Sequence, residues 1–281
     1  MKRFNVFLLL FCMSQLAPFA CRTPLPQGVP LGGDDPRPER LLEEMVAQAH
    51  LRTALQGAAR LSIDAQDLSF SRPQRMAVEK PGRLRVEVLG LFDQIAGLVV
   101  TRDRSFQFLD ARTGRLEEGR VDPDILWRVA RIDLSPEEAV DVILGVPAAQ
   151  PGFRVAAAET FQEGRIAFDR VDGRGVRRER YVFDEAGRPI EVQRMGPDGD
   201  LVWRVRYSDF RPVDPSGDET ISFAFEIEMD FPRVEARAKL AFKRVSLPAS
   251  LPDALFVLPR RDSARPGASS DALARVGGEA R

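Results

Sequence analysis

The sequence predicts a mainly β protein of the α+β class, with an antiparallel sheet of about eleven strands. Apolar and charged residues alternate over several stretches, most clearly over 221–229 and 234–242. Such alternation gives a strand one apolar and one solvated face, which is typical of antiparallel sheets. Short turns such as Asp172-Gly173 separate consecutive strands. Two helix-start signals interrupt these stretches near the middle of the chain, so the sheet is expected to carry a helical pair.

Residues 1–20 have the features of a bacterial signal peptide. Lys2 and Arg3 are followed by a short apolar run over 4–11, and small or neutral residues stand at 17–20. The apolar run is too short to cross a bilayer as a helix. We therefore expect the protein to be exported.

Ala20-Cys21 resembles the end of a bacterial lipobox, in which a diacylglyceryl group is attached to the cysteine sulfur. Pro18 and Phe19 depart from the usual pattern, so ordinary secretory cleavage is the alternative. Lipid on Cys21 would hold the chain on a membrane. By resemblance to lipoprotein sorting rules, Arg22 favours the outer membrane. The expected location is the cell envelope, lipid-anchored at the outer membrane and facing the periplasm.

Composition divides the remaining chain into three parts. Residues 21–38 combine the anchor cysteine with a segment rich in Pro, Gly and Asp, which predicts a flexible linker. Residues 39–260 carry the apolar periodicities and are expected to form the folded domain. Residues 261–281 are small and polar, which predicts a disordered tail.

The expected domain begins with a helix and continues with about five strands. Apolar residues recur at helical spacing over 41–49, opposite Glu39, Glu43 and Glu44. Period-two alternation then predicts strands around 83–88 and 105–108. After the helical pair, about six more strands are expected, including those around 166–168, 201–207, 221–229 and 234–242.

The helical pair is predicted from its capping residues. Asp122 followed by Pro123 has the pattern of an N-cap before a proline at the first helical position. Ser135 followed by Glu138 at the third position forms a capping box. The second helix is expected to end at Gly145.

Several function classes are disfavoured by composition. The 41 basic and 42 acidic residues give a formal net charge of −1, without the basic surface expected of a nucleic-acid-binding protein. Cys12 and Cys21 both lie in the export region, and His50 is the single histidine. A metal site, a cofactor and a catalytic triad therefore have few residues to build on, and we expect no enzyme. His50 fits a helix C-terminus, and the acidic residues around 169–184 fit solvated hairpins.

Three stretches together resemble the LolA/LolB-type fold of bacterial lipoprotein carriers and receptors. They are the strand over 82–90 (GRLRVEVLG), the helix start over 134–138 (LSPEE) and the ending over 251–256 (LPDALF). The resemblance covers most of residues 39–260 as a pattern of elements. It implies a strongly curved antiparallel half-barrel covered by a helical lid, with an apolar cavity for acyl chains. The lipid anchor makes the chain more similar to the outer-membrane receptor than to the soluble carrier.

In the receptor, a loop between strands exposes a hydrophobic residue that helps to deliver cargo to the membrane. The equivalent loop here contains Leu91 and Phe92, and the alternative is that both pack in the core. The candidates for lining the cavity are apolar residues of the strands and helices, and the alternative is that they fill a solid core. They are Leu84, Val86, Val88, Phe106, Phe108, Ile125, Trp127, Ile143, Phe168, Trp203, Phe223 and Phe225.

The expected function is therefore that of an envelope lipoprotein that binds acyl chains for transfer to, or assembly of, the outer membrane. The resemblance implies lipid or an acylated lipoprotein as cargo, and a periplasmic carrier protein as a further partner. An adaptor lipoprotein that docks a partner complex and binds no lipid is the alternative. An envelope hydrolase is the least favoured class.

Overall fold

The computed structural model describes residues 28–213 and 221–258. Within these residues, fourteen strands form one sheet in which all neighbouring strands are antiparallel. The strands are β1 (Val29–Pro30), β2 (Ala54–Ala65), β3 (Leu68–Glu79), β4 (Arg83–Leu89), β5 (Ile95–Arg102), β6 (Ser105–Asp110), β7 (Arg115–Arg120), β8 (Arg154–Thr160), β9 (Ile166–Val171), β10 (Arg177–Phe183), β11 (Pro189–Met195), β12 (Leu201–Val213), β13 (Ile221–Phe231) and β14 (Ala236–Ser246). Cys21, the expected signal peptide over 1–20 and the expected tail over 261–281 lie outside the described residues.

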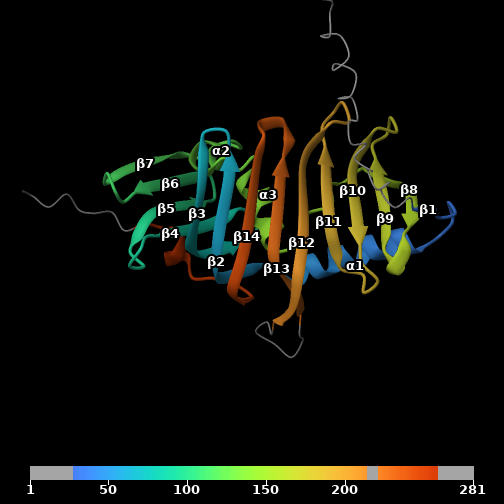
Figure 1. Ribbon diagram of the computed structural model, residues 1–281, viewed down its shortest axis with the longest axis horizontal. Coiled ribbons are helices and arrows are strands. Elements are labelled where there is room, and N and C mark those ends of the chain that lie inside the picture. The colour runs from blue at the N-terminus through green and yellow to red at the C-terminus, as the bar shows by residue number, and fades with distance from the viewer. Residues whose placement is uncertain (1–27, 214–220, 259–281) are drawn as a thin grey trace, which may run out of the picture.

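The strand order joins the two halves of the chain side by side. It runs β1-β8-β9-β10-β11-β12-β13-β14-β2-β3-β4-β5-β6-β7, so the last strand β14 pairs with β2 (Figure 1). Leu240 of β14 lies opposite Leu61 of β2 in this pairing. Both residues belong to the main apolar core, which therefore runs continuously across the junction.

The mainly β, antiparallel class is confirmed, but the expected strand number was too low. Among the described strands, β1 precedes the first helix, six rather than about five lie between that helix and the helical pair, and seven rather than about six follow the pair. The strand β7 has the sequence RLEEGR and buries none of its residues, so it has no apolar alternation to reveal it. The two-residue strand β1 lies in the segment that was expected to be a linker, and it pairs with Thr160 and Glu159 of β8. Such edge strands are held by backbone pairing, which sequence periodicity does not report.

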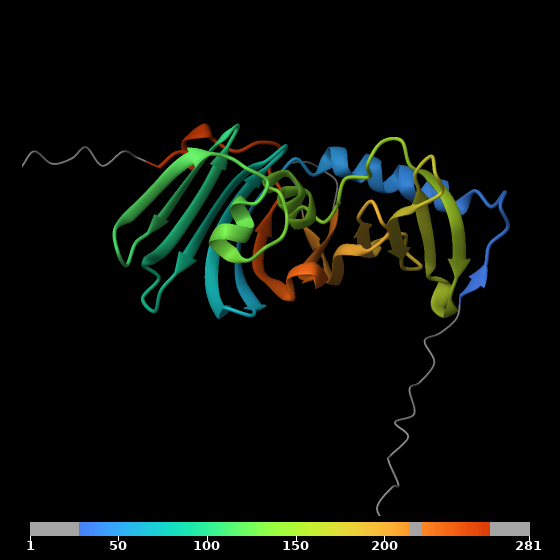
Figure 2. The same ribbon diagram turned by 90° about the horizontal axis from the view of Figure 1, so that it is seen from above.

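The sheet is an open row with β1 and β7 at its two ends, which do not pair with each other. The sheet is therefore open rather than closed, and the strong curvature of a half-barrel stays an expectation from the resemblance. Three helices, α1 (Arg37–Leu51), α2 (Ile125–Ala130) and α3 (Pro136–Ile143), lie along one side of the sheet (Figure 2). Among the described helices, none is long and apolar enough to cross a membrane.

The helix-start signals were correct for α3 and wrong in detail for α2. Ser135 Oγ accepts a hydrogen bond from the Glu138 backbone N–H, and the Glu138 carboxylate accepts one from the Ser135 N–H, which completes the capping box. The N-cap of α2 is Asp124 rather than Asp122. Asp122 instead accepts a hydrogen bond from the Asp124 N–H in the preceding turn, because a short acidic side chain can also bond locally. In α1, His50 lies in the last turn, as expected.

The main core lies between the helices and the facing side of the sheet. It contains two aromatic groups, one of stacked rings from β9 and β10 and one of edge-to-face rings from β13 and β14. A smaller cluster lies on the opposite face, where the C-terminal segment 247–258 covers β3 to β5. Phe256, only 1% exposed, packs there with Leu98 and Val100. Both faces are therefore covered around β3 to β5.

Candidate functional site

A cavity of about 530 Å³ lies between the helical pair and the sheet around β3 to β6. Among the residues that the structure describes, all that line it except Gln74 and Arg112 are apolar or, at Gly97, without a side chain. The lining residues are Leu61, Leu68, Phe70, Gln74, Met76, Leu84, Val86, Val88, Ala96, Gly97, Leu98, Val99, Phe108, Arg112, Leu126, Val129, Ala130, Ile132, Leu134, Ala139, Ile143, Met229 and Leu240.

The floor of the cavity follows from strand alternation and register. Residues Leu84, Val86 and Val88 lie on one face of β4 because they are two positions apart. Met76 of β3 lies opposite Val86, and Gln74 lies opposite Val88. The floor is thus a grid of medium-sized apolar side chains with one amide.

The absence of a side chain at Gly97 helps to keep the space open. Gly97, on β5, lies opposite Val88, on β4. A Cβ atom at Gly97 would lie 3.8 Å from the Leu109 carbonyl oxygen and 3.9 Å from Val88 Cβ, which are ordinary contact distances. The backbone there would therefore accept a larger residue, and that residue would fill part of the cavity.

The roof consists of α2, α3 and the segment between them, and α3 is fixed to its surroundings by polar contacts. The hydroxyl of Tyr207 on β12 donates a hydrogen bond to the Val142 carbonyl oxygen at 3.1 Å. Asp141 lies 3.5 Å from the ammonium of Lys80, which also donates to the Ala49 carbonyl oxygen at the end of α1. Burial raises the pKa of Asp141, and the neighbouring Lys80 charge opposes this rise.

The two polar lining residues belong to the same end of the cavity. Gln74 and Val88 are paired across β3 and β4, and Val88 and Gly97 across β4 and β5. Arg112 lies in the turn after β6, where the neighbouring Ala111 N–H donates to the Ala96 carbonyl oxygen at 3.1 Å. The Arg112 side chain is 84% exposed, so it provides a cation at the rim. Gln74 is 1% exposed and provides a buried amide.

Two exposed apolar side chains stand on the loop that adjoins this end. Leu91 and Phe92, between β4 and β5, are 84% and 89% exposed, so neither is part of the core. The loop is internally bonded, since the Phe92 N–H donates to Gln94 Oε1 at 2.8 Å and the Gly90 N–H donates to the Gln94 carbonyl oxygen at 2.8 Å. The two side chains are therefore held away from the sheet by an ordered turn.

The structure distributes the twelve candidate lining residues over three places. Leu84, Val86, Val88, Phe108 and Ile143 line the cavity. Trp127 lines a separate, polar hollow, and the Arg131 guanidinium lies 5.4 Å from the centre of its ring. The remaining six are buried in the main core, namely Phe106, Ile125, Phe168, Trp203, Phe223 and Phe225.

Sequence reasoning missed most of the roof and the β3 part of the floor. Leu126, Val129 and Leu134 lie on or next to short helical segments, where apolar spacing does not show which side faces a cavity. Phe70 and Met76 alternate correctly on β3, although Pro73 between them weakens the strand signal. Alternation could have found these two residues, but it could not have placed the helices over them.

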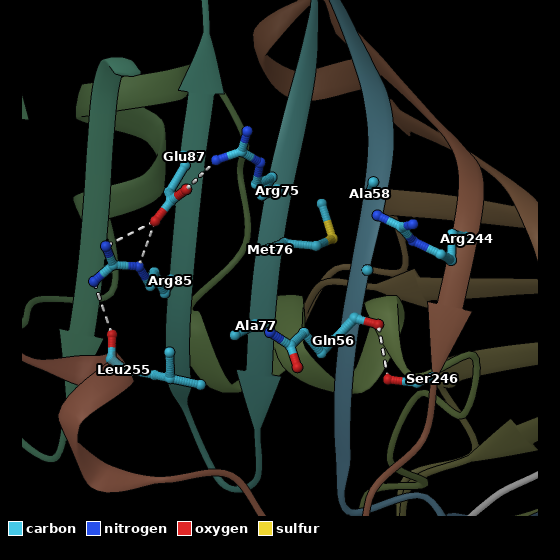
Figure 3. A pocket seen from close by; sticks show the side chains of 11 residues that line it. Gln56, Ala58, Arg75, Met76, Ala77, Arg85, Glu87, Arg244, Ser246 and Leu255 are labelled. Carbon is cyan, nitrogen blue, oxygen red and sulfur yellow. Dashed lines mark hydrogen bonds and ion pairs between the residues drawn. The ribbon is translucent and has the colours of Figure 1, made fainter. Parts of the chain in front are cut away.

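A second hollow, of about 400 Å³, lies on the opposite face of the sheet over β14, β2, β3 and β4 (Figure 3). Its charges are largely paired within the protein. The Arg85 guanidinium lies 2.7 Å from Glu87 and also donates to the Leu255 carbonyl oxygen at 2.9 Å, and Arg75 lies 3.8 Å from Glu87. This groove therefore offers few free groups to a ligand, and we take the apolar cavity as the candidate site.

The acidic residues of the hairpins are engaged in contacts within the protein. Asp172 and Asp184 accept backbone N–H groups within their own turns. Glu179 had been expected to be solvated, but it is fully buried. Its carboxylate pairs with Arg170 and, at 3.3 Å, with Arg194. A buried carboxylate requires such partners, which explains the arginines around it. Among the described residues, no cluster of three or more His, Cys, Asp or Glu could hold a metal ion.

Comparison with known proteins gives a structural likeness without a sequence match. No model of a known protein family matches the chain, and no curated protein sequence does. A DUF1329 family protein from Desulfovibrio piger superposes with a TM-score of 0.53 at 15% identity, over 78% of this chain and 95% of that chain. A domain assigned to outer membrane lipoprotein sorting, from Vibrio parahaemolyticus, gives a TM-score of 0.49 at 13% identity, over 77% and 94% of the two chains.

A LolA superfamily protein from Nitrosomonas europaea gives a TM-score of 0.46 at 10% identity, over 77% of this chain and 97% of that chain. At such identities, the likeness concerns the fold and not the activity. The chain is thus similar in fold to the DUF1329 family protein from Desulfovibrio piger, and the LolA/LolB-type role expected from the sequence stays a proposal.

Proposed function

We propose that this protein is a lipid-anchored envelope protein that binds an acyl chain of a lipid or an acylated lipoprotein and passes it on to the outer membrane. The observation that carries the proposal is the apolar cavity under the helical pair, whose lining contains only two polar side chains. An acyl chain has no polar groups along its length, so a lining of this composition suits it.

The size of the cavity is compatible with such a ligand. Its volume of about 530 Å³ is within the range of about 300–1,000 Å³ that is typical of small-molecule sites. Each methylene group moved from water into the cavity would contribute about 0.8 kcal/mol. A chain of a dozen methylenes could therefore be held firmly without any polar contact.

The exposed loop gives the proposal a route to the membrane. Leu91 and Phe92 are almost fully exposed, and the loop starts beside the cavity residues Val88 and Ala96. Apolar side chains at this position would insert into a bilayer interface and bring the end of the cavity close to lipid. We propose that lipid on Cys21 keeps the protein near that surface, and that a periplasmic carrier supplies the cargo.

Arg112 at the rim would favour a ligand with an anionic head group. Its guanidinium is largely exposed and lies 4.0 Å from Asp110, so it remains accessible to a second partner. A guanidinium binds carboxylate and phosphate groups well. The cavity would then hold the chain, and the rim would hold the head.

The test is native mass spectrometry followed by lipid extraction, with residues 22–281 purified from a bacterial host without harsh detergent. A bound phospholipid or acylated peptide would support the proposal. The variant Gly97→Leu, which narrows the cavity, is the control and should carry less lipid. A ligand-free protein that also fails to bind added fatty acid would overturn the proposal and favour the adaptor role, for which a co-purifying protein partner would then be sought.

A further inference from the structure

Gln74 is a polar residue without a partner in an otherwise apolar wall. It lies on the cavity-facing side of β3 and is only 1% exposed. Neither its Oε1 nor its Nε2 has a hydrogen-bond partner among the residues that the structure describes. A buried amide in this condition is unfavourable for folding, because it loses its hydrogen bonds to water and gains none in exchange.

The packing around Gln74 does not explain the amide. Its neighbours across the sheet are Ala59 on β2 and Val88 on β4, and neither has a polar side chain. A methionine or leucine would fill the same volume without leaving polar atoms unpaired. Because Gln74 belongs to the lining of the cavity, a ligand held there would supply the partner that the amide lacks.

The position of Gln74 gives the cavity a polar end and an apolar end. The row Gln74, Val88 and Gly97 lies next to the β4–β5 loop, since the following pair, Leu89 and Ile95, is the last before that loop. Arg112 belongs to the same end, because its turn is bonded to Ala96. The lining residues toward the other end of β4 and on α3, which include Leu84 and Ile143, are all apolar. A ligand would thus place its head near the loop and its chain toward α3.

We propose that Gln74 recognises a group near the head of the acyl chain that both donates and accepts hydrogen bonds, such as a hydroxyl or a secondary amide. This inference rests on the proposed function. A carboxamide has an acceptor oxygen and a donor nitrogen. An ester carbonyl can only accept, so it would leave Oε1 unpaired, whereas a hydroxyl or an amide can pair with both atoms. The cavity therefore selects hydroxylated or amide-linked acyl chains over plain acyl esters.

Three neutral probes of equal chain length test this selection without involving the charge of Arg112. They are methyl tetradecanoate, methyl β-hydroxytetradecanoate and N-methyltetradecanamide, each titrated against residues 22–281 by displacement of a fluorescent fatty acid. We expect the hydroxylated ester and the amide to bind about tenfold more tightly than the plain ester. Whichever of these two probes binds more tightly shows whether a hydroxylated chain or an amide-linked chain is the better ligand.

The variant Gln74→Met should abolish this preference and bind the plain ester at least as well as the wild type does. Ser69→Ala, at an exposed position of the same strand outside the cavity, is the matched control and should keep the preference. Equal binding of all three probes by the wild type would overturn the inference while leaving acyl binding intact, because the amide would then be satisfied by water. Binding of none of the probes would overturn the proposed function as well. The comparison of probes on the wild type does not depend on how well the variants fold.

Discussion

The hydroxyl of Tyr207, on β12, donates a hydrogen bond to the carbonyl oxygen of Val142, on α3, at 3.1 Å. Tyr207 is buried, and burial raises the pKa of its hydroxyl well above the ordinary value, so it remains a donor at neutral pH. The bond connects the roof of the cavity to a strand outside the cavity wall. It is therefore a contact by which the sheet fixes the position of the helix.

Replacing Tyr207 with phenylalanine should weaken this connection without opening a large hole. The Val142 carbonyl also accepts the Gly145 N–H at 3.0 Å, so it would not be left unpaired. We expect a loss of about 1 kcal/mol in the free energy of unfolding, measured by urea denaturation. The variant Tyr207→Ala, which removes the buried ring as well, should lose about 3–5 kcal/mol. If Tyr207→Phe were as damaging as Tyr207→Ala, the hydrogen bond would not be the relevant contact.

The capping box of α3 should contribute measurably to the stability of the roof. Ser135→Ala removes the acceptor for the Glu138 N–H, which is 3.2 Å from Ser135 Oγ. The expected loss is about 1 kcal/mol, with faster amide hydrogen exchange in the first turn of α3. Ser69→Ala, at an exposed position of β3, is the control and should leave both quantities unchanged. Unchanged exchange in α3 would show that tertiary packing alone fixes its first turn.

Filling the cavity from Gly97 should separate ligand binding from folding. A leucine there meets only ordinary contacts at its Cβ atom, and the loss of a strand glycine is favourable by about 0.5–1 kcal/mol. We expect Gly97→Leu to bind acyl probes at least tenfold more weakly, with a thermal midpoint no lower than that of the wild type. Ser69→Leu, which adds the same side chain outside the cavity, should bind normally. Full binding by Gly97→Leu would place the ligand elsewhere.

Charge on the exposed loop should block delivery but not binding. Because Leu91 and Phe92 are 84% and 89% exposed, their replacement by glutamate should change stability by no more than about 0.5 kcal/mol. We expect slower transfer of a fluorescent acyl lipid from the protein to vesicles, with unchanged affinity for the free probe. Leu116→Glu is the matched control, since Leu116 is an exposed leucine on β7, 48% accessible. Equal transfer rates for loop and control variants would remove the loop from the mechanism.

Asp141 should make the roof sensitive to pH. Burial, opposed by Lys80, raises its pKa above the ordinary value of 3.8. A raised carboxyl pKa means that the folded state binds the proton more tightly than the unfolded state does. The contribution of Asp141 to stability is therefore complete below the ordinary pKa and is lost as the pH rises through the raised value.

Asp141→Asn removes this dependence. The free energy of unfolding of Asp141→Asn, minus that of the wild type, should be larger at about pH 7 than at about pH 3. Urea denaturation at both pH values gives the two differences, and the subtraction cancels the titration of the other carboxyl groups. A difference that does not change with pH would contradict the raised pKa.

Much of the fold was predictable from the sequence because its signals are local. Alternation along β13 and β14 assigned the strands, since a side-chain period of two needs no knowledge of the neighbours. The capping box at Ser135 marked the start of α3 for the same reason. The number of strands was underestimated because β1 and β7 depend on pairing with β8 and β6, and their own residues carry no apolar alternation.

The candidate site was predictable only in part. Val86 and Phe223 have the same sequence signature, an apolar residue on the inner face of a strand, yet Val86 lines the cavity and Phe223 is fully buried in the core. The difference depends on which helices lie above each strand and on the space left by Gly97, which involves residues from distant parts of the chain. Glu179 shows the same limit, since only the folded protein brings Arg170 and Arg194 to its carboxylate.

The sequence by itself determined the antiparallel class, the position of the helical pair and the loop that carries Leu91 and Phe92. It also provided the export signal and Cys21 as expectations about location. Over residues 28–213 and 221–258, the tertiary structure decided that the sheet is one open row of fourteen strands, that space remains under the helices, and that Gln74 lines this space without a partner. The physical reason is that periodicity and capping are properties of neighbouring residues, whereas a cavity and an unpaired buried group exist only where separate elements meet.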